Sequence, residues 1–145
     1  MVIDTVCADE NLPARAHPFD AGADLKAGLT VEIGASATAL VPTGVRVAIP
    51  EKHVGLLFAR SSLSKRGLLM ANGVGVIDSG YTGEVMVPLH NVNGRAEAVE
   101  RGERIAQLVV LKCELPLFAQ VERLPGTERG EGGFGSTGSG GEVQP

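Results

Sequence analysis

Short stretches in which apolar and polar residues alternate are the feature that most constrains how this chain can fold. Residues 29–33 and 45–49 both alternate in this way. No segment sustains a period of 3.6 residues over ~10 residues, and the one helical candidate is a single turn at residues 62–66, capped by Ser61 or Ser62. Many short strands with closely spaced turn signals predict an all-β protein, an antiparallel sandwich or barrel of jelly-roll type.

Longer apolar runs and a proline refine this prediction. Residues 54–58 are almost continuously apolar, which indicates a strand covered on both faces. Residues 84–89 alternate, but Pro88 lacks an N–H donor and so predicts an edge strand or a bulge. Residues 105–111 form the longest apolar run, and residues 118–124 are expected to close the body.

The length and the composition along the chain predict one folded domain with an appended arm. A chain of 145 residues suits one domain, and an apolar content of 43% suits a packed core. Beyond Pro125 the composition shifts to Gly, Ser, Thr and Glu, which cannot bury enough apolar surface to order a segment. We therefore expect a β-barrel domain over residues 1–125 and a flexible Gly-rich C-terminal arm over residues 126–145.

Charge and hydropathy exclude several classes of protein. The net charge of −4 argues against a broad nucleic-acid-binding surface. No apolar run approaches the ~18 residues that span a bilayer, and the first residues lack the basic region of a secretion signal. Cys7 and Cys113 lack metal-site spacing and are expected to be free thiols in a reducing cytoplasm, with a single disulfide between them as the alternative.

Two polar clusters precede the middle of the chain. Asp20 and Asp24 are four residues apart and would share one face of a strand, although a solvated acidic turn fits equally well. Arg60, Ser61 and Ser62 directly follow an apolar stretch. A cation, hydroxyl groups and the first N–H groups of a helical turn can together cradle an anion, and a simply capped turn is the alternative.

The stretch from Gly75 to Val85 combines an acid with the one tyrosine of the chain. Its two apolar pieces, joined by a Gly-rich turn, predict a hairpin with Asp78 and Tyr81 at its tip. A ring and a carboxylate held close together could stack on a flat ligand and act on a neighbouring bond. Asn72 lies just upstream, and its side chain offers both a donor and an acceptor for a nucleobase edge. An ordinary loop with a solvated acid and a surface tyrosine is the alternative.

The last two polar clusters lie in the second half of the chain. Gln107 interrupts the longest apolar stretch, and a buried amide needs partners from the backbone or from a ligand. In the tail, Arg129 and Phe134 stand among glycines, which let backbone N–H groups approach a phosphate closely. The arginine could hold that phosphate while the ring stacks on a base.

The order and spacing of these five clusters resemble the five motifs of the trimeric dUTPases. The matching stretches are Asp-Ala-Gly-x-Asp-Leu, Arg-Ser-Ser, Gly-x-Ile-Asp-x-x-Tyr-x-Gly, Arg-Gly-x-Arg-Ile-Ala-Gln-Leu and Arg-Gly-x-Gly-Gly-Phe-Gly-Ser-Thr-Gly. The resemblance covers residues 20–138, nearly the whole chain. It implies a jelly-roll β-barrel, assembled as a homotrimer with sites between subunits.

The resemblance also implies an activity. The enzymes of this family hydrolyse dUTP to dUMP and pyrophosphate with Mg²⁺, which limits uracil incorporation into DNA and supplies dUMP for dTMP synthesis. Asp78 would activate the water that attacks the α-phosphorus, and Tyr81 would lie under the deoxyribose, where a 2′-hydroxyl would clash. No side chain is expected to bind Mg²⁺ directly, and Asp24 would act through water.

The substrate contacts that the resemblance implies come from all parts of the chain. They are assigned to Arg60, Ser61, Ser62, Asn72, Val76, Ile77, Asp78, Tyr81, Met86, Gln107, Arg129, Phe134, Gly135 and Ser136. The serines, Arg60 and Gln107 would contact the phosphates, and Asn72 and the hairpin backbone would read the uracil edge. Phe134 would stack on uracil and Arg129 would hold the γ-phosphate, both from a tail that closes over the site of another subunit.

Three positions depart from the family pattern, and two other functions compete. Gly80 replaces an acid, Thr82 replaces a larger residue, and Ser62 stands where bacterial relatives often have glycine. A dCTP deaminase on the same fold also carries Arg-Ser-Ser-Leu, but its catalytic glutamate lies in a Trp-containing setting and this chain has no Trp. A catalytically idle trimer that docks a partner with its tail would not need Asp78.

Overall fold

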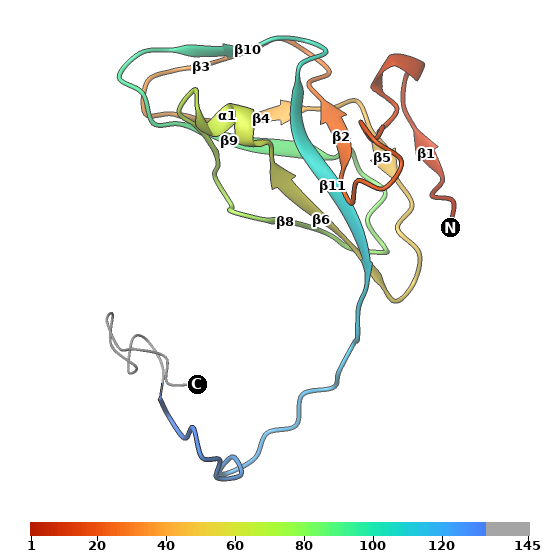
Figure 1. Ribbon diagram of the computed structural model, residues 1–145, viewed down its shortest axis with the longest axis vertical. Helices are drawn as coiled ribbons and strands as arrows, with labels where there is room; N and C mark the ends of the chain where they lie inside the picture. The colour runs from red at the N-terminus through yellow and green to blue at the C-terminus, as the bar shows by residue number, and fades with distance from the viewer. Residues whose placement is uncertain (133–145) are drawn as a thin grey trace. The chain divides into compact units, whose positions relative to one another are not determined.

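The structure is a computed structural model that describes residues 1–132. Figure 1 shows a body built of short strands. In chain order the elements are β1 (Thr5–Val6), the 3-10 turn η1 (Asp9–Asn11), β2 (Ala23–Lys26), β3 (Val31–Ile33), β4 (Thr38–Pro42), β5 (Arg46–Val47), β6 (His53–Ala59), α1 (Ser61–Ser64), β7 (Leu68–Met70), β8 (Gly75–Ile77), β9 (Met86–Asn91), β10 (Glu97–Val99) and β11 (Arg104–Lys112).

The strands pair in a nested order. β2 pairs with β11, β3 with β10 and β4 with β9, and every pair is antiparallel. Such nesting arises when one long antiparallel ribbon rolls up on itself, which is the origin of a jelly roll. The prediction of an all-β, jelly-roll-type fold is therefore confirmed.

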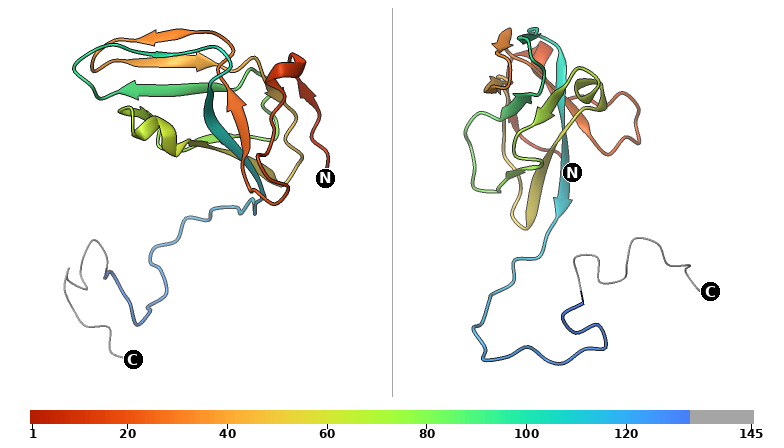
Figure 2. Two further views of the ribbon diagram at one scale, coloured as in Figure 1. Left: turned by 45° about the horizontal axis from the view of Figure 1, so that its top comes forward. Right: turned by 90° about the vertical axis from the view of Figure 1, so that its left-hand side faces the viewer.

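The core lies between two sheets that arise from this winding. One is four-stranded with the order β2-β11-β6-β8, and the other is three-stranded with the order β4-β9-β7 (Figure 2). Two-stranded ribbons, β1-β5 and β10-β3, complete the body. The largest fully buried side chains are aliphatic and come from both sheets, among them Leu25, Leu57, Val87, Leu89 and Ile105.

The predicted one-turn helix is present, but the prediction that Ser61 or Ser62 caps it is wrong. The residue before α1 is Arg60, which is extended and makes no side-chain capping bond. Ser61 and Ser62 already lie inside the helix, because the chain turns as soon as it leaves β6, so neither can serve as the cap. The turn is instead anchored by Leu63, whose side chain is fully buried in the core.

The predicted hairpin around Asp78 is wrong. β8 pairs with β6, whereas β9 pairs with β4 and β7, so the two strands belong to different sheets. Residues 78–85 are the crossing between the sheets, which is longer than the two to five residues of a usual hairpin turn. The turn within this crossing is real, since Tyr81 N donates to Asp78 O at 3.0 Å.

Two expectations about strand exposure were also wrong. β9 is the central strand of its sheet, so Pro88 does not mark an edge strand. Pro88 lies one residue beyond the last β7 pair, Met70 with Leu89, where its carbonyl still accepts from Ala71 N at 2.9 Å and only the returning N–H bond is lost. β6 is not covered on both faces of this chain, since Val54 and Leu56 are half-buried and Phe58 is 36% exposed.

The chain divides into two units, Met1–Leu115 and Pro116–Pro145. Residues 118–124 form no strand, in contrast to the expectation that they close the body, and Leu117 and Phe118 are almost fully exposed. Within residues 1–132 no helix is both long and apolar enough to cross a membrane.

Candidate active site

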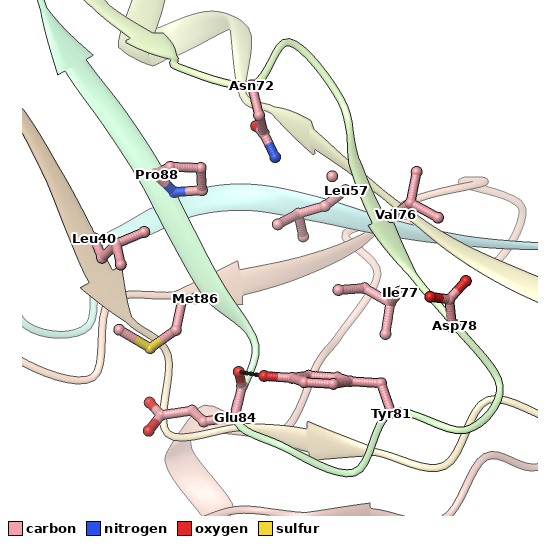
Figure 3. Close-up of a pocket in the computed structure, with 11 residues that line it drawn as sticks. Leu40, Leu57, Asn72, Val76, Ile77, Asp78, Tyr81, Glu84, Met86 and Pro88 are labelled. Atoms are coloured by element: carbon pink, nitrogen blue, oxygen red, sulfur yellow. Dashed lines mark hydrogen bonds between the residues drawn. The ribbon is translucent and has the colours of Figure 1, made fainter.

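The first candidate pocket opens between β8 and β9, where the two strands diverge into different sheets. Its volume is about 300 Å³. Figure 3 shows Leu57 at the back, with the crossing 78–85 along one side and Asn72 opposite. The pocket is lined by Leu40, Leu57, Asn72, Gly75, Val76, Ile77, Asp78, Tyr81, Glu84, Met86 and Pro88. The predicted residues Asn72, Val76, Ile77, Asp78, Tyr81 and Met86 are thus brought together.

Asp78 and Tyr81 differ in how firmly they are held. Asp78 directly follows β8 and is exposed, and its carboxylate accepts no hydrogen bond from residues 1–132. Tyr81 is 43% exposed, but its hydroxyl donates to Glu84 O at 2.8 Å. A Cβ on Gly83 would lie 2.5 Å from the tyrosine oxygen, so only glycine lets the ring lie across the backbone here. The pocket therefore has a fixed ring beside a free carboxylate.

The wall opposite Tyr81 offers backbone groups as well as side chains. β8 is the edge strand of the four-stranded sheet, so half of its N–H and C=O groups have no strand partner. Such groups can hydrogen-bond to a flat polar ligand, as an added strand would. Asn72 lies just before β8, and its side chain can add one donor and one acceptor.

The second candidate pocket, of about 340 Å³, gathers the other predicted polar residues. It is lined by Ala16, Asp20, Ala21, Gly22, Asp24, Arg60 and Gln107. Asp24 and Asp20 do not share a strand face as expected, because only Asp24 lies in β2. Asp20 instead lies in the preceding loop, where its carboxylate accepts from His17 N at 2.9 Å.

A shared carboxylate organises the cations beside this pocket. Asp24 is only 9% exposed, and its Oδ2 accepts from Arg60 at 3.0 Å and from Arg104 at 3.2 Å. Two guanidinium groups therefore share one carboxylate, and Asp20 contributes a second carboxylate to the same pocket. Arginines held in this way are well suited to exchange a carboxylate for the oxygens of a phosphate.

Gln107 lies in the same pocket for reasons of strand register. It stands opposite Asp24 on one side and Phe58 on the other, so the three side chains share the outer face of the sheet. Gly22 leaves room for it, because a Cβ there would lie 2.9 Å from Gln107 Oε1. Within residues 1–132 the Gln107 amide makes no side-chain hydrogen bond, which leaves it available to a ligand.

The two pockets share no lining residue and lie on opposite faces of the four-stranded sheet. Leu57 and Gly75, at the first pocket, are a register pair on the core face, whereas Asp24 and Gln107 lie on the outer face. One chain therefore does not bring Asp78 and Arg60 into a single pocket.

The remaining predicted residues lie elsewhere. Ser61 and Ser62 are exposed on α1, next to Arg60. Arg129 belongs to the unit beyond Leu115, where its Nε donates to Gly132 O at 3.1 Å. Phe134, Gly135 and Ser136 lie outside the described residues.

Sequence reasoning missed several residues of both pockets. Leu40 and Leu57 line the first pocket from strands far away in the sequence, and only the pairing of strands could have placed them. Arg104 lies in a recognised motif, but its ion pair with Asp24 spans 80 positions. Glu84 carries no sequence signal beyond its place after the Tyr-x-Gly stretch.

Comparison with known proteins gives one consistent family. The model of the dUTPase family matches residues 8–138. The deoxyuridine 5'-triphosphate nucleotidohydrolase of Cutibacterium acnes is 46% identical over 140 residues, which cover 95% of this chain and 92% of the relative.

Solved structures agree with the sequence relatives. The dUTPase of Staphylococcus bacteriophage 80alpha with dUpNHpp superposes with a TM-score of 0.85 at 32% identity, covering 94% of this chain and 98% of that one. A dUTPase from phage phi11 of S. aureus, described with a structural Mg(II) ion, has a TM-score of 0.76 at 28% identity and covers 85% of this chain and 98% of that one.

Proposed function

This chain belongs to the dUTPase family and is a dUTP nucleotidohydrolase, and we propose that its two pockets are complementary halves of one reaction site. The enzyme hydrolyses dUTP to dUMP and pyrophosphate. In the cell this reaction would limit uracil incorporation into DNA and supply dUMP for dTMP synthesis. The observation that carries the proposal is the gathering of Asn72, Asp78 and Tyr81 in one pocket, with Arg60 and Gln107 in the other.

The first pocket takes the nucleoside. Backbone groups at the free edge of β8, including those of Val76 and Ile77, form hydrogen bonds with the uracil edge, as does the side-chain amide of Asn72. Met86 forms part of the apolar lining. Tyr81 lies under the deoxyribose, where its ring leaves no space for a 2′-hydroxyl. This role is supported by the hydrogen bond that holds the tyrosine hydroxyl on Glu84 O.

Asp78 prepares the nucleophile. Its unpaired carboxylate accepts a hydrogen bond from a water molecule and orients it toward the α-phosphorus. As the water oxygen bonds to phosphorus, its proton passes to the carboxylate, and the bond from phosphorus to the α,β-bridging oxygen breaks. The products are dUMP and pyrophosphate, and the carboxylate then returns its proton to solvent.

The second pocket takes the phosphates. Arg60 and Gln107 line this cavity, and the hydroxyl and N–H groups of Ser61 and Ser62 directly follow Arg60 on α1. Arg60 would exchange its contact with Asp24 for a phosphate oxygen, while Arg104 keeps the carboxylate neutralised. Cations aimed at phosphate oxygens stabilise the charge that develops during transfer.

The donor set fits Mg²⁺ that is held mainly by the substrate. Within residues 1–132 no group of three or more His, Cys, Asp or Glu side chains could enclose a metal. Mg²⁺ keeps several waters and is commonly held by substrate phosphates with one or two carboxylates. Asp24 lies beside the phosphate pocket and would hold such waters in its outer shell, where the ion supplies charge neutralisation.

A homotrimer would join the two half-sites. The outer face of β6 and β11 carries apolar side chains that are exposed or half-buried in the part of the chain that the structure describes, namely Val54, Leu56, Phe58, Val109 and Leu111. The same face carries Asp24 and Gln107, so contact between copies along it would place the phosphate pocket of one copy at the boundary with the next. Apolar faces of this kind are characteristic of permanent subunit interfaces.

The C-terminal arm would complete each site in trans. Arg129 would hold the γ-phosphate and Phe134 would stack on uracil, with Gly135 and Ser136 offering close backbone contacts. We keep residues 1–125 as the barrel domain and residues 126–145 as the arm that closes over it. The two cysteines, Cys7 and Cys113, are free thiols, which supports a cytoplasmic location.

A pyrophosphate-release assay with Mg²⁺ across dUTP, dCTP, dTTP and UTP tests this function. We expect dUTP to be hydrolysed with the highest kcat/KM by a wide margin. Ammonia release from dCTP would identify a deaminase instead. Absence of pyrophosphate from dUTP would show that the chain is an idle, partner-binding member of the family.

A further inference from the structure

Glu84 lines the nucleoside pocket but has no part in the reaction described above. We propose that Glu84 is a positioning residue for Tyr81 and thereby contributes to the discrimination between deoxyribose and ribose. The inference rests on the proposed place of Tyr81 beneath the sugar. It concerns which contacts hold the Tyr81 ring in that place.

The crossing that carries Tyr81 is fastened to the body at its far end. Val85 N donates to Val45 O at 2.8 Å, and the buried Thr43 hydroxyl donates to Val85 O at 2.7 Å. Thr43 Oγ1 also accepts from Val45 N at 3.1 Å. The turn between β4 and β5 thus anchors the end of the crossing.

Glu84 adds a side-chain contact to the same turn. Its carboxylate accepts a hydrogen bond from Gly44 N at 2.7 Å. A carboxylate that accepts from a backbone N–H makes one of the stronger hydrogen bonds in proteins. Residue 84 is therefore held on both sides, by its own side chain and by the following peptide N–H.

The carbonyl of Glu84 is also the acceptor for the Tyr81 hydroxyl, at 2.8 Å. The Val85 N–H and the Glu84 C=O belong to one peptide plane, and the bond to Val45 fixes only one end of it. Without the carboxylate, that plane can rotate about the bond to Val45. The rotation displaces the oxygen that holds the tyrosine.

Little else holds the ring in place. In the described chain, residues 82 and 83 lie in no strand and make no backbone hydrogen bond. The ring rests on Gly83, which presents no side chain. With 43% of Tyr81 exposed, the ring can swing outward once its hydroxyl is released. The space it leaves is the space that excludes the 2′-hydroxyl of a ribonucleotide.

The test compares kcat/KM for dUTP with kcat/KM for UTP in Glu84→Ala, Glu84→Gln, Tyr81→Phe and the Glu84→Ala/Tyr81→Phe double variant. Glu84→Ala is expected to lower the dUTP-to-UTP ratio about fivefold, the size of one lost hydrogen bond. Glu84→Gln is expected to keep the ratio near that of the unchanged protein, because the amide oxygen accepts the same bond. Tyr81→Phe keeps the ring but loses its bond, so the double variant is expected to match the single variants.

A matched control and an independent readout accompany these variants. Glu32 is exposed on β3 and its side chain makes no hydrogen bond in residues 1–132, so Glu32→Ala is expected to leave the ratio unchanged. The affinities of dUMP and UMP, titrated without turnover, are expected to change in the same ratio. An unchanged ratio in Glu84→Ala, additive losses in the double variant, or a Gln variant that behaves like Ala would each overturn the inference. Failure of the unchanged protein to hydrolyse dUTP would overturn the proposed function instead.

Discussion

At the scale of single residues, the two carboxylates of the candidate site have opposite environments. Asp24 is buried between two arginines, whereas Asp78 is exposed with no hydrogen-bond donor in the described chain. A carboxylate that already accepts from two guanidinium groups has fewer lone pairs left for a water molecule, and an unpaired one is free to bind water. This contrast supports the assignment of Asp78, and not Asp24, to the nucleophilic water.

Replacing Asp78 with Asn tests that assignment. The amide is isosteric and leaves the pocket intact, so dUTP affinity is expected to stay within about threefold of the original value. Turnover is expected to fall by at least about 10²-fold, because the proton acceptor for water is lost. Equilibrium titration with dUpNHpp and steady-state pyrophosphate release measure the two quantities, and near-normal turnover would remove Asp78 from the mechanism.

Residue identities were easier to predict than their partners. Arg60 and Asp78 stand out because they directly follow apolar stretches, and Gln107 because it interrupts one. Tyr81 stands out as the one tyrosine of the chain. Their partners do not, because the bonds from Arg104 to Asp24 and from Glu84 to Gly44 join residues 80 and 40 positions apart. Only the winding of the strands brings such pairs together.

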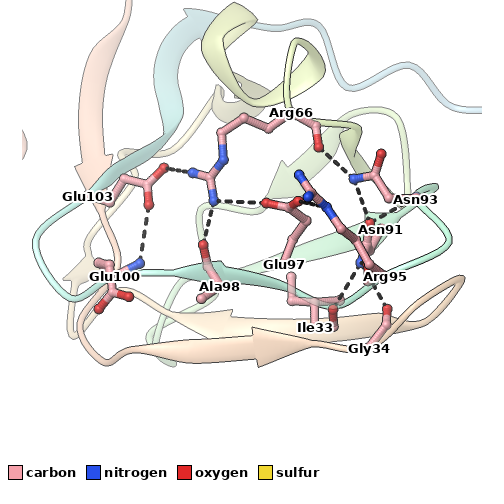
Figure 4. Close-up of polar contacts among 10 residues, drawn as sticks. All are labelled: Ile33, Gly34, Arg66, Asn91, Asn93, Arg95, Glu97, Ala98, Glu100 and Glu103. Carbon is pink, nitrogen blue, oxygen red and sulfur yellow. Dashed lines mark hydrogen bonds and ion pairs between the residues drawn. The ribbon is translucent and has the colours of Figure 1, made fainter.

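At the scale of elements, α1 is tied to the β10–β11 turn by a polar cluster (Figure 4). Arg66, just beyond α1, donates to the carboxylate of Glu103 and to the carbonyl of Ala98. Its own carbonyl accepts from Asn93 Nδ2 at 2.7 Å. The cluster therefore joins the segment that carries Ser61 and Ser62 to the strand that carries Gln107.

Arg66→Ala is expected to destabilise the protein by about 1–3 kcal/mol, because the Ala98 carbonyl and one oxygen of the part-buried Glu103 carboxylate lose the hydrogen bonds that Arg66 donates. Arg95→Ala is the control, since the Arg95 side chain is 82% exposed in its ion pair with Glu97 and its loss is expected to cost less than about 0.5 kcal/mol. Urea unfolding at one fixed protein concentration compares the two. Equal losses in both variants would show that the cluster is not a structural tie.

The elements themselves were only partly predictable. Alternation located β3 and β5 within two residues, because each has one buried face, and the longest apolar run located β11 within one residue. It could not tell that β8 and β9 join different sheets, since adjacent strands with a Gly-rich connection look alike whether or not they pair. Nor could it show that residues 118–124 form no strand, because their composition resembles that of a strand.

At the scale of the whole molecule, the arm is the part whose role rests on sequence resemblance. Deletion of residues 126–145 removes Arg129 and Phe134 but none of the buried core. The truncated protein is expected to keep its unfolding midpoint and its subunit number while kcat/KM for dUTP falls about 10²-fold. Light scattering, thermal unfolding and the pyrophosphate assay follow these properties, and an undiminished rate would exclude the arm from catalysis.

The placement of both half-sites on one chain, on opposite faces of a sheet, leads to the central claim that neighbouring copies complete each other. Asp78→Asn disables only the nucleoside half and Arg60→Ala only the phosphate half. Each variant alone is expected to be nearly inactive, whichever way the site is built.

Mixing the two variants distinguishes a site shared between two copies from a site built within one copy. Equal amounts of both, unfolded together and refolded into mixed trimers, place an intact nucleoside half beside an intact phosphate half at about a quarter of the sites. The account predicts that the mixture regains about a quarter of the dUTP hydrolysis shown by the unchanged protein refolded in the same way. A mixture no more active than either variant alone would contradict it.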